Sequence, residues 1–139
     1  MSIRRTFPAV PVDQREWMRF LSGLFFAREF TTILGGCTTS PSGTVRYTVS
    51  AGIVCMSIPD LSGTSDSTLA FLDNLPPEIT PAHDQSCMAR IINNGVTAVG
   101  LVNVGIDTGI TLYKDLDAGA FTNVGTKGVK FTNIVYPLD

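Results

Sequence analysis

From Thr44 to Tyr136 the chain is a succession of short β-like segments separated by turn residues. In Thr44–Ser50, apolar and polar residues alternate, which is the pattern of a strand with one buried face. Asn94-Gly95 is the strongest signal for a two-residue hairpin turn in the sequence. Short segments joined by Gly, Asn and Pro are typical of sandwiches and barrels. The sequence therefore predicts a mainly β fold, a jelly-roll β-sandwich.

The same patterns predict the individual elements of this region. The expected strands are 44–50, 52–58, 68–72, 86–93, 96–102, 109–114 and 128–136. Three stretches are expected to lie outside strands because they are rich in small polar residues, Pro or Gly. These are a loop at 61–67, a rigid crossing at 75–81 and a hairpin turn at 125–128.

Ahead of the β-like region the sequence predicts an extended N-terminal arm and one short helix. Pro8 and Pro11 deny regular structure to residues 1–12. Asp13 followed by Glu16 is a capping-box pattern that starts a helix, which we expect to end near Arg28. An apolar stripe runs along it at the spacing i, i+3, i+4, i+7, i+8: Trp17, Phe20, Leu21, Leu24 and Phe25.

Two interpretations of this helical stripe remain open. It packs against the chain's own sheet, or it docks the chain onto another protein. A Ser-, Thr-, Pro- and Gly-rich link at 38–43 separates the helix from the strands and is compatible with either. We divide the chain into an N-terminal arm and docking helix at 1–36 and a jelly-roll domain at 37–139, with the stripe as the candidate protein-docking site.

The composition favours a protein that associates with other subunits. Hydrophobic residues make up 44% of the chain, charged residues 16%, and the mean hydropathy is +0.23. Small domains have much surface, so an apolar excess needs cover. No run approaches the roughly 18 apolar residues of a membrane-spanning helix, and the N-terminus lacks the apolar core of a signal peptide. With a net charge of −2 and no basic stripe, we expect neither nucleic-acid binding nor membrane insertion.

The three cysteines are far apart in the sequence. Cys37, Cys55 and Cys87 form no paired spacing, which argues against a disulfide framework. Cys55 and Cys87 lie in apolar strand-like runs, so we expect them to be buried thiols in a reducing compartment.

Three patterns resemble catalytic or metal-binding motifs. Asp107-Thr108-Gly109 is the triplet of aspartic proteases, in which two carboxylates share a proton, and a dimeric protease is a remote alternative. The residues around the triplet depart from that family's pattern, so we expect a turn. His83 and Cys87 could form a base and nucleophile, but we expect His83 in a surface loop. One His and three scattered Cys give no zinc spacing. We expect no enzyme activity, cofactor or metal.

Several segments carry a resemblance to a known class of module. They are Tyr47–Val54, Leu61–Ser65, Leu75-Pro76 through Thr80-Pro81, Asn94-Gly95, Gly109–Tyr113, Phe121-Thr122 with Gly125 and Gly128, and Ile134–Leu138. In this order they resemble the knob or head modules of tailed-bacteriophage structural proteins, which are similar to the trimeric jelly rolls of complement and tumour-necrosis-factor heads. Phe7–Pro11 and Trp17–Leu24 are similar to the lead-ins before such modules.

The resemblance implies a homotrimer in a virion that contacts capsid or tail proteins. A fibre tip follows a long shaft, and no shaft is seen here, so we expect a module attached directly to a shell or tail surface: a head-decoration or short-fibre component. The alternative is a tail adhesin that binds a host receptor or glycan.

Overall fold

The computed structural model describes residues 27–139, which form ten β-strands and one 3-10 turn, η2 (Pro77–Ile79). The strands are β1 (Arg28–Gly35), β2 (Ser42–Ser50), β3 (Ile53–Ile58), β4 (Leu61–Thr64), β5 (Phe71–Leu72), β6 (Gln85–Asn93), β7 (Val96–Gly105), β8 (Gly109–Tyr113), β9 (Thr126–Val129) and β10 (Thr132–Pro137).

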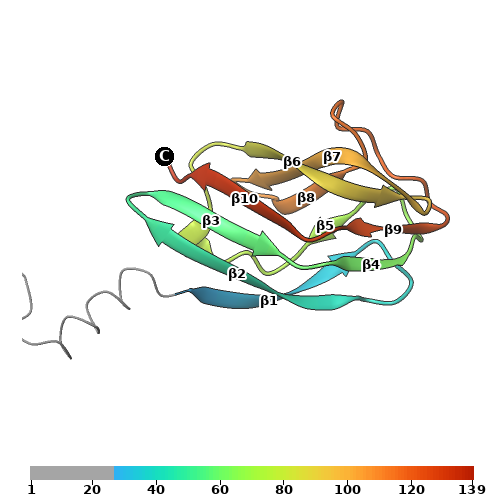
Figure 1. The fold of residues 1–139 in the computed structure, drawn as a ribbon, viewed down its shortest axis with the longest axis horizontal. Coiled ribbons are helices and arrows are strands. Elements are labelled where there is room, and N and C mark those ends of the chain that lie inside the picture. The colour runs from blue at the N-terminus through green and yellow to red at the C-terminus, as the bar shows by residue number, and fades with distance from the viewer. Residues whose placement is uncertain (1–26) are drawn as a thin grey trace, which may run out of the picture.

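All ten strands belong to one curled antiparallel sheet with the order β10-β3-β2-β1-β5-β8-β7-β6-β9-β4. In Figure 1, β1, β2 and β3 lie in the lower layer and β6, β7 and β8 in the upper layer. Strand β1 joins the two layers, because Arg28–Ile33 pair with β2 whereas Leu34 and Gly35 pair with β5. The prediction of a mainly β, sandwich-like fold is confirmed.

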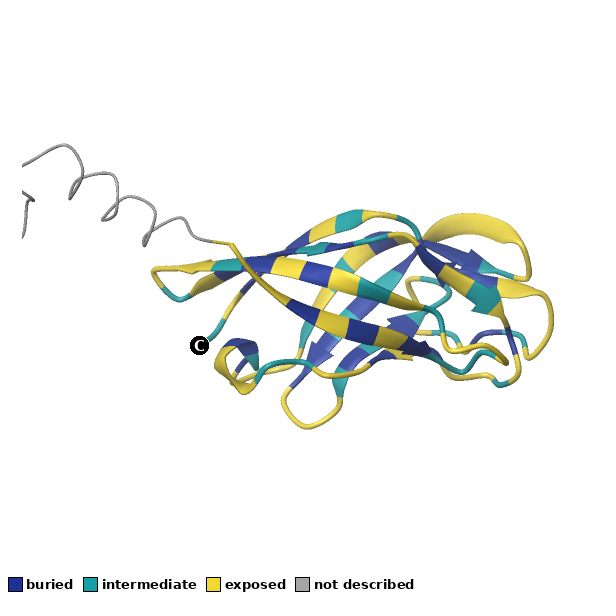
Figure 2. Ribbon diagram, turned by 90° about the horizontal axis from the view of Figure 1, so that it is seen from below, coloured by how far each residue is buried: buried dark blue, intermediate teal, exposed yellow. Residues whose placement is uncertain are grey.

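The strands form where side chains alternate between core and solvent (Figure 2). In β3, for example, Val54, Met56 and Ile58 are buried while Cys55 is exposed. Facing layers bury these alternate residues against each other, and this burial supplies the main driving force for the fold. Among the largest fully buried side chains of residues 27–139 are Tyr136, Leu34, Met56, Ile58, Leu72, Ile79 and Ile91.

Two hairpins turn through pairs of residues with positive φ. Asn94 and Gly95 have φ of 50° and 79° and join β6 to β7, which confirms the predicted hairpin. Ala51 and Gly52 have φ of 51° and 77° and join β2 to β3 in the same way. Both turns carry the right-handed twist of the flanking strands and fix their register.

The chain crosses between layers at two places where the sequence interpretation was wrong. Leu61–Thr64, expected to be loop, is strand β4 and pairs with β9. The single strand expected at 128–136 is two strands, because the chain leaves β6 after Val129 and joins β3 as β10. A strand that changes partners midway cannot be recognised from its own alternation, since both halves keep the period of two.

The burial of Lys127 in the core is the main difference from the sequence-based expectation. We expected 125–128 to be a turn, but Lys127 lies in β9 and is fully buried. Its ammonium donates hydrogen bonds to the carbonyl oxygens of Ser67, at 2.8 Å, and Leu69. It also lies 5.7 Å from the centre of the Phe121 ring, within cation–π range. Burial lowers the pKa of Lys127. This lysine ties β9 to the segment between β4 and β5.

Strand β1 begins before the predicted start of the β-domain at residue 37. Phe30, Thr32 and Leu34 are buried in alternation, which makes Arg28–Gly35 part of the sheet. Arg28, the expected end of the helix, is therefore the first residue of a strand. The predicted arm and the rest of the helix lie outside the described residues.

Cys55 and Cys87 were predicted to be buried, and neither is fully buried. All three are free thiols; Cys55 is exposed, and Cys37 and Cys87 are half-buried. The prediction for Cys55 was wrong because apolar residues occupy both phases of β3, so that apolar content does not identify the inward face.

Candidate functional site

The acidic triplet lies where a turn was predicted. Asp107 and Thr108 occupy the turn between β7 and β8, and the pair Gly105 and Gly109 closes it. Gly109 has a φ of 69°, which glycine adopts without strain. The Asp84 carboxylate accepts a hydrogen bond from the Ile106 amide at 2.9 Å and holds this turn. The turn interpretation of Asp107 is confirmed.

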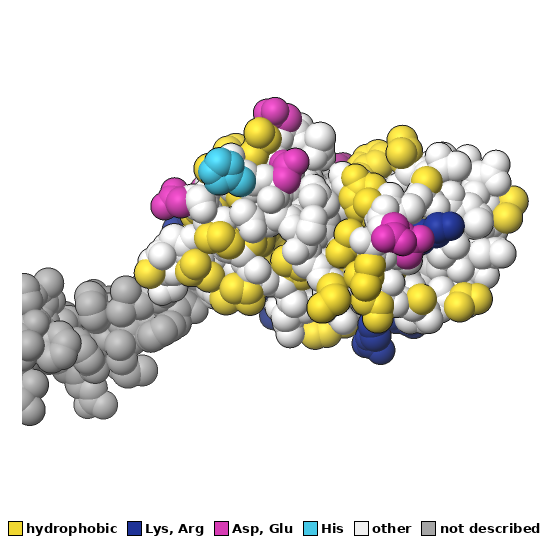
Figure 3. Space-filling view, turned by 90° about the horizontal axis from the view of Figure 1, so that it is seen from above, with side chains coloured by type: hydrophobic (Ala, Val, Ile, Leu, Met, Phe, Trp, Pro, Cys, Tyr) yellow, Lys and Arg dark blue, Asp and Glu magenta, His cyan; other side chains and the backbone are white. Residues whose placement is uncertain are grey.

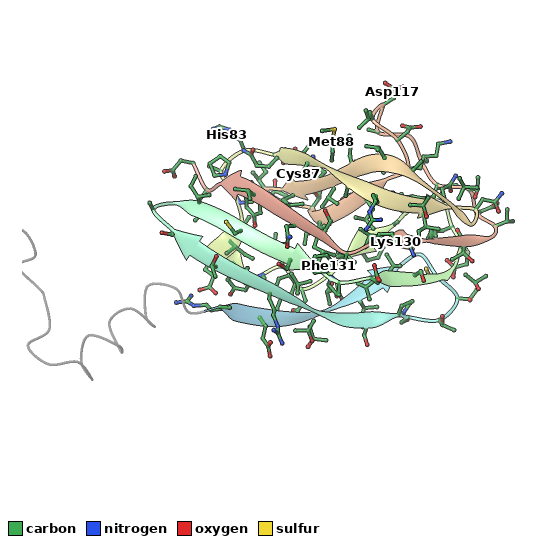
Figure 4. All side chains as sticks on the ribbon, in the orientation of Figure 1. His83, Cys87, Met88, Asp117, Lys130 and Phe131 are labelled. Carbon is green, nitrogen blue, oxygen red and sulfur yellow. The ribbon has the colours of Figure 1, made fainter. Side chains whose placement is uncertain are left out.

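The His83 and Cys87 pair has the surroundings of structural residues. His83 is exposed in the loop before β6, as predicted. The Cys87 thiol donates to the Val135 carbonyl at 3.7 Å, and burial raises its pKa. A nucleophilic cysteine needs a lowered pKa, because the thiolate is the reactive form. Figure 4 shows both residues.

The potential metal ligands of the described chain are not clustered. Within residues 27–139, no three His, Cys, Asp or Glu side chains are grouped to hold a metal ion.

The same part of the chain contains no helix long and apolar enough to span a membrane.

The predicted docking residues Trp17, Phe20, Leu21, Leu24 and Phe25 lie outside the described residues, and the structure begins just after them. At that point Arg28 donates to the Glu78 carboxylate at 2.7 Å, and Tyr47 donates to the same carboxylate. These hydrogen bonds, first from Tyr47 and then from Arg28, hold the pKa of Glu78 below its ordinary value. They tie the start of β1 to β2 and η2.

The outer face of the upper layer carries a group of apolar side chains beside the polar row Ser86, Asn103 and Thr111. Met88, Leu101 and Tyr113 are direct neighbours across β6, β7 and β8, so their side chains lie on one side of the sheet. Arg90 and Val99 form the next pair along. Met88 and Val99 are 68% and 52% exposed. We call Met88, Val99, Leu101 and Tyr113 the outer face; Figure 3 shows this side of the molecule, with apolar side chains in several groups between polar ones.

A shallow groove adjoins the outer face at the seam between β6 and β10. Its volume is about 320 Å³. We call it the seam groove; it is lined by Met88, Ala89, Arg90, Val99, Phe131 and Thr132. Phe131 is 52% exposed and lies where the chain passes from β9 to β10, held by its amide donating to Asp60 at 2.5 Å. The groove therefore combines an apolar floor with one guanidinium and one hydroxyl.

The sequence analysis missed both surfaces. Met88 and Val99 lie in strands that were predicted correctly, but their exposure depends on which phase of each strand faces the core. The groove also needs Phe131, whose position follows from the unpredicted break between β9 and β10. The usable signal was the apolar content of both phases of 86–93 and 96–102.

Comparison with known proteins gives a likeness in fold only. No protein-family model matches the chain, and no curated protein matches its sequence. Among solved structures it is similar to a reovirus attachment protein, sigma1, solved in complex with alpha-2,3-sialyllactose. The two share 15% sequence identity with a TM-score of 0.45, over 81% of this chain and 66% of that one. This likeness is a coarse one, between two β-rich folds.

Proposed function

We propose that this chain is a non-enzymatic structural module of a virus particle, a head-decoration or short-fibre component. Its N-terminal segment docks onto capsid or tail proteins, and its β-domain is displayed as a homotrimer. The observation that carries the proposal is the outer face, where Met88 and Val99 are exposed on the strands of a rigid sheet.

The outer face supports self-association for a physical reason. Single exposed apolar residues are normal, but a contiguous group on one sheet face marks an interaction surface. Within this group and its paired neighbours, Arg90 is the one charged side chain. The interiors of subunit interfaces are similarly poor in charge. The bacteriophage-module resemblance of the sequence agrees with three copies.

A second candidate function is receptor or glycan binding by the displayed domain. The seam groove favours it, because Phe131 offers an aromatic surface while Arg90 and Thr132 offer donors. An aromatic platform with a few polar groups is a common way to hold a small polar ligand.

The docking role of the N-terminal segment is tested by a double substitution, Trp17→Ala with Phe25→Ala. Burying each such side chain contributes about 1.5–3 kcal/mol, so we expect binding to purified capsids lacking this chain to weaken at least about tenfold. Cosedimentation measures the binding, and thermal melting of the β-domain is expected to stay unchanged.

The matched control is Arg19→Ala, because Arg19 lies on the same predicted helix but outside the stripe. This variant should bind the capsids as the wild type does. Unchanged cosedimentation of the double variant would refute docking through the stripe. A clearly lowered melting temperature would show that the stripe belongs to the protein's own core, and would also refute it.

A further inference from the structure

The loop between β8 and β9 displays an apolar residue between two acids. Leu116 is 55% exposed and is flanked by Asp115 and Asp117. Figure 4 places Asp117 at the outer tip of this loop, which projects from the upper layer. A single exposed leucine is normal on a protein surface, but this one projects on a loop and is accessible to a partner.

The loop has a fixed shape, so that Leu116 is presented in a defined position. The Asp115 carboxylate accepts hydrogen bonds from the amides of Asp117, at 3.0 Å, and Gly119, at 2.8 Å. The Lys114 amide donates to the Gly119 carbonyl at 3.1 Å. A preformed loop loses little conformational entropy on binding, which favours association.

The seam groove has the complementary chemistry. Its lining is mostly apolar, and Arg90 is the one charged residue that lines it. Figure 4 shows Met88, Lys130 and Phe131 in this region. In the described part of the chain the ion pairs are Arg28–Glu78 and Arg46–Glu29, so Arg90, Lys130 and Asp117 are all free to pair with another molecule.

We propose that the Leu116 loop of one copy sits in the seam groove of a neighbouring copy, with Asp117 facing Arg90. This inference rests on the proposed self-association and names its contact. Loop and groove are different surfaces, so the contact is heterologous. Such a contact gives a closed ring or an open filament depending on the rotation between copies, and the proposed trimer corresponds to a closed ring of three.

The occupant is a second copy because the two surfaces match in polarity and charge. Leucine burial supplies affinity, whereas the charged edges fix orientation and disfavour wrong pairings. A stable interface buries about 1,200–2,000 Å² in total, more than a loop and groove provide. The groove shares Met88 and Val99 with the outer face, so a neighbour seated in it also covers part of that face.

Charge reversal in the full-length chain tests the contact, with mass measured by light scattering across a dilution series. In Arg90→Glu the groove edge repels the acidic loop, and in Asp117→Lys the loop repels the basic edge. We expect each variant to need at least about tenfold higher concentration to assemble, and the double variant to recover most of that loss. Leu116→Ser should weaken assembly to a similar degree.

The matched control is Val124→Ser, because Val124 is 58% exposed and lies in the same β8–β9 connection, but outside both the hydrogen-bonded turn at 114–119 and the lining of the groove; it should assemble normally. A monomeric wild type would overturn the proposed self-association and this contact together. An oligomeric wild type whose reversal variants assemble unchanged, or whose double variant is no better than the singles, would overturn the contact alone. The contact would also be overturned if an acidic oligosaccharide binds the wild-type oligomer, and Arg90→Glu abolishes that binding while the mass of the oligomer stays the same.

Discussion

Replacing Lys127 with Met is expected to lower the free energy of unfolding by about 3 kcal/mol. Methionine fills similar space but has no donor, so the carbonyl oxygens of Ser67 and Leu69 lose the hydrogen bonds of the ammonium and keep only those from the Ser65 and Ser67 hydroxyls, at 3.0 and 3.3 Å. A hydrogen bond to a charged group contributes about 1.5–3 kcal/mol. Removing a buried charge can stabilise a protein when its partners are also replaced, but here both carbonyls remain. Urea unfolding measures the loss.

Lys114→Met is the control for this substitution, because Lys114 is only half-buried; it is expected to change stability by less than about 0.5 kcal/mol. The pH dependence gives a second readout. Burial lowers the pKa of Lys127 below its ordinary value of 10.5. Between the lowered pKa and pH 10.5, this lysine therefore binds a proton in the unfolded chain but not in the folded one. Wild-type stability relative to Lys127→Met should therefore rise as pH rises through the lowered pKa towards 10.5. Equal stability of Lys127→Met and wild type would refute the structural role of this lysine.

Gly36→Ala is expected to destabilise the fold by about 3 kcal/mol, through two effects at one position. Gly36 has a φ of 91°, where an L side chain is strained by about 1–2 kcal/mol. A methyl group there would also overlap the carbonyl oxygen of Leu69 and lie 2.7 Å from the Lys127 ammonium. Overpacking of this kind costs about 1–3 kcal/mol. Thermal or urea unfolding measures the sum.

Gly52→Ala separates the two effects. Gly52 has a similar φ of 77°, but an added Cβ would meet nothing within 4 Å. Gly52→Ala should therefore lower the free energy of unfolding only by the conformational strain, about 1–2 kcal/mol. If Gly36→Ala and Gly52→Ala lower the free energy of unfolding equally, the close packing of Gly36 against Leu69 and Lys127 contributes nothing to stability.

The sequence was most informative where local chemistry alone decides the structure. Asn94-Gly95 adopts the predicted hairpin because few residues other than glycine and asparagine accept positive φ. Strand β2 was predicted almost to its ends, because Val45 and Tyr47 alternate with polar residues. Asp107 falls in its predicted turn for the same local reason.

The sequence was least informative where distant segments meet. Lys127 is buried because carbonyls from residues 67 and 69 reach it, and no nearby residue signals this. The seam groove needs β6 and the β9–β10 break side by side. Cys55 faces solvent because of sheet register, which the apolar run around it hides.

The most direct test of the account is the mass of the full-length wild-type chain in solution, measured by light scattering at micromolar concentration. The chain weighs 14.9 kDa, and the account predicts a species about three times heavier. A single species of 14.9 kDa would contradict it, because the outer face would then remain exposed to water without a partner copy.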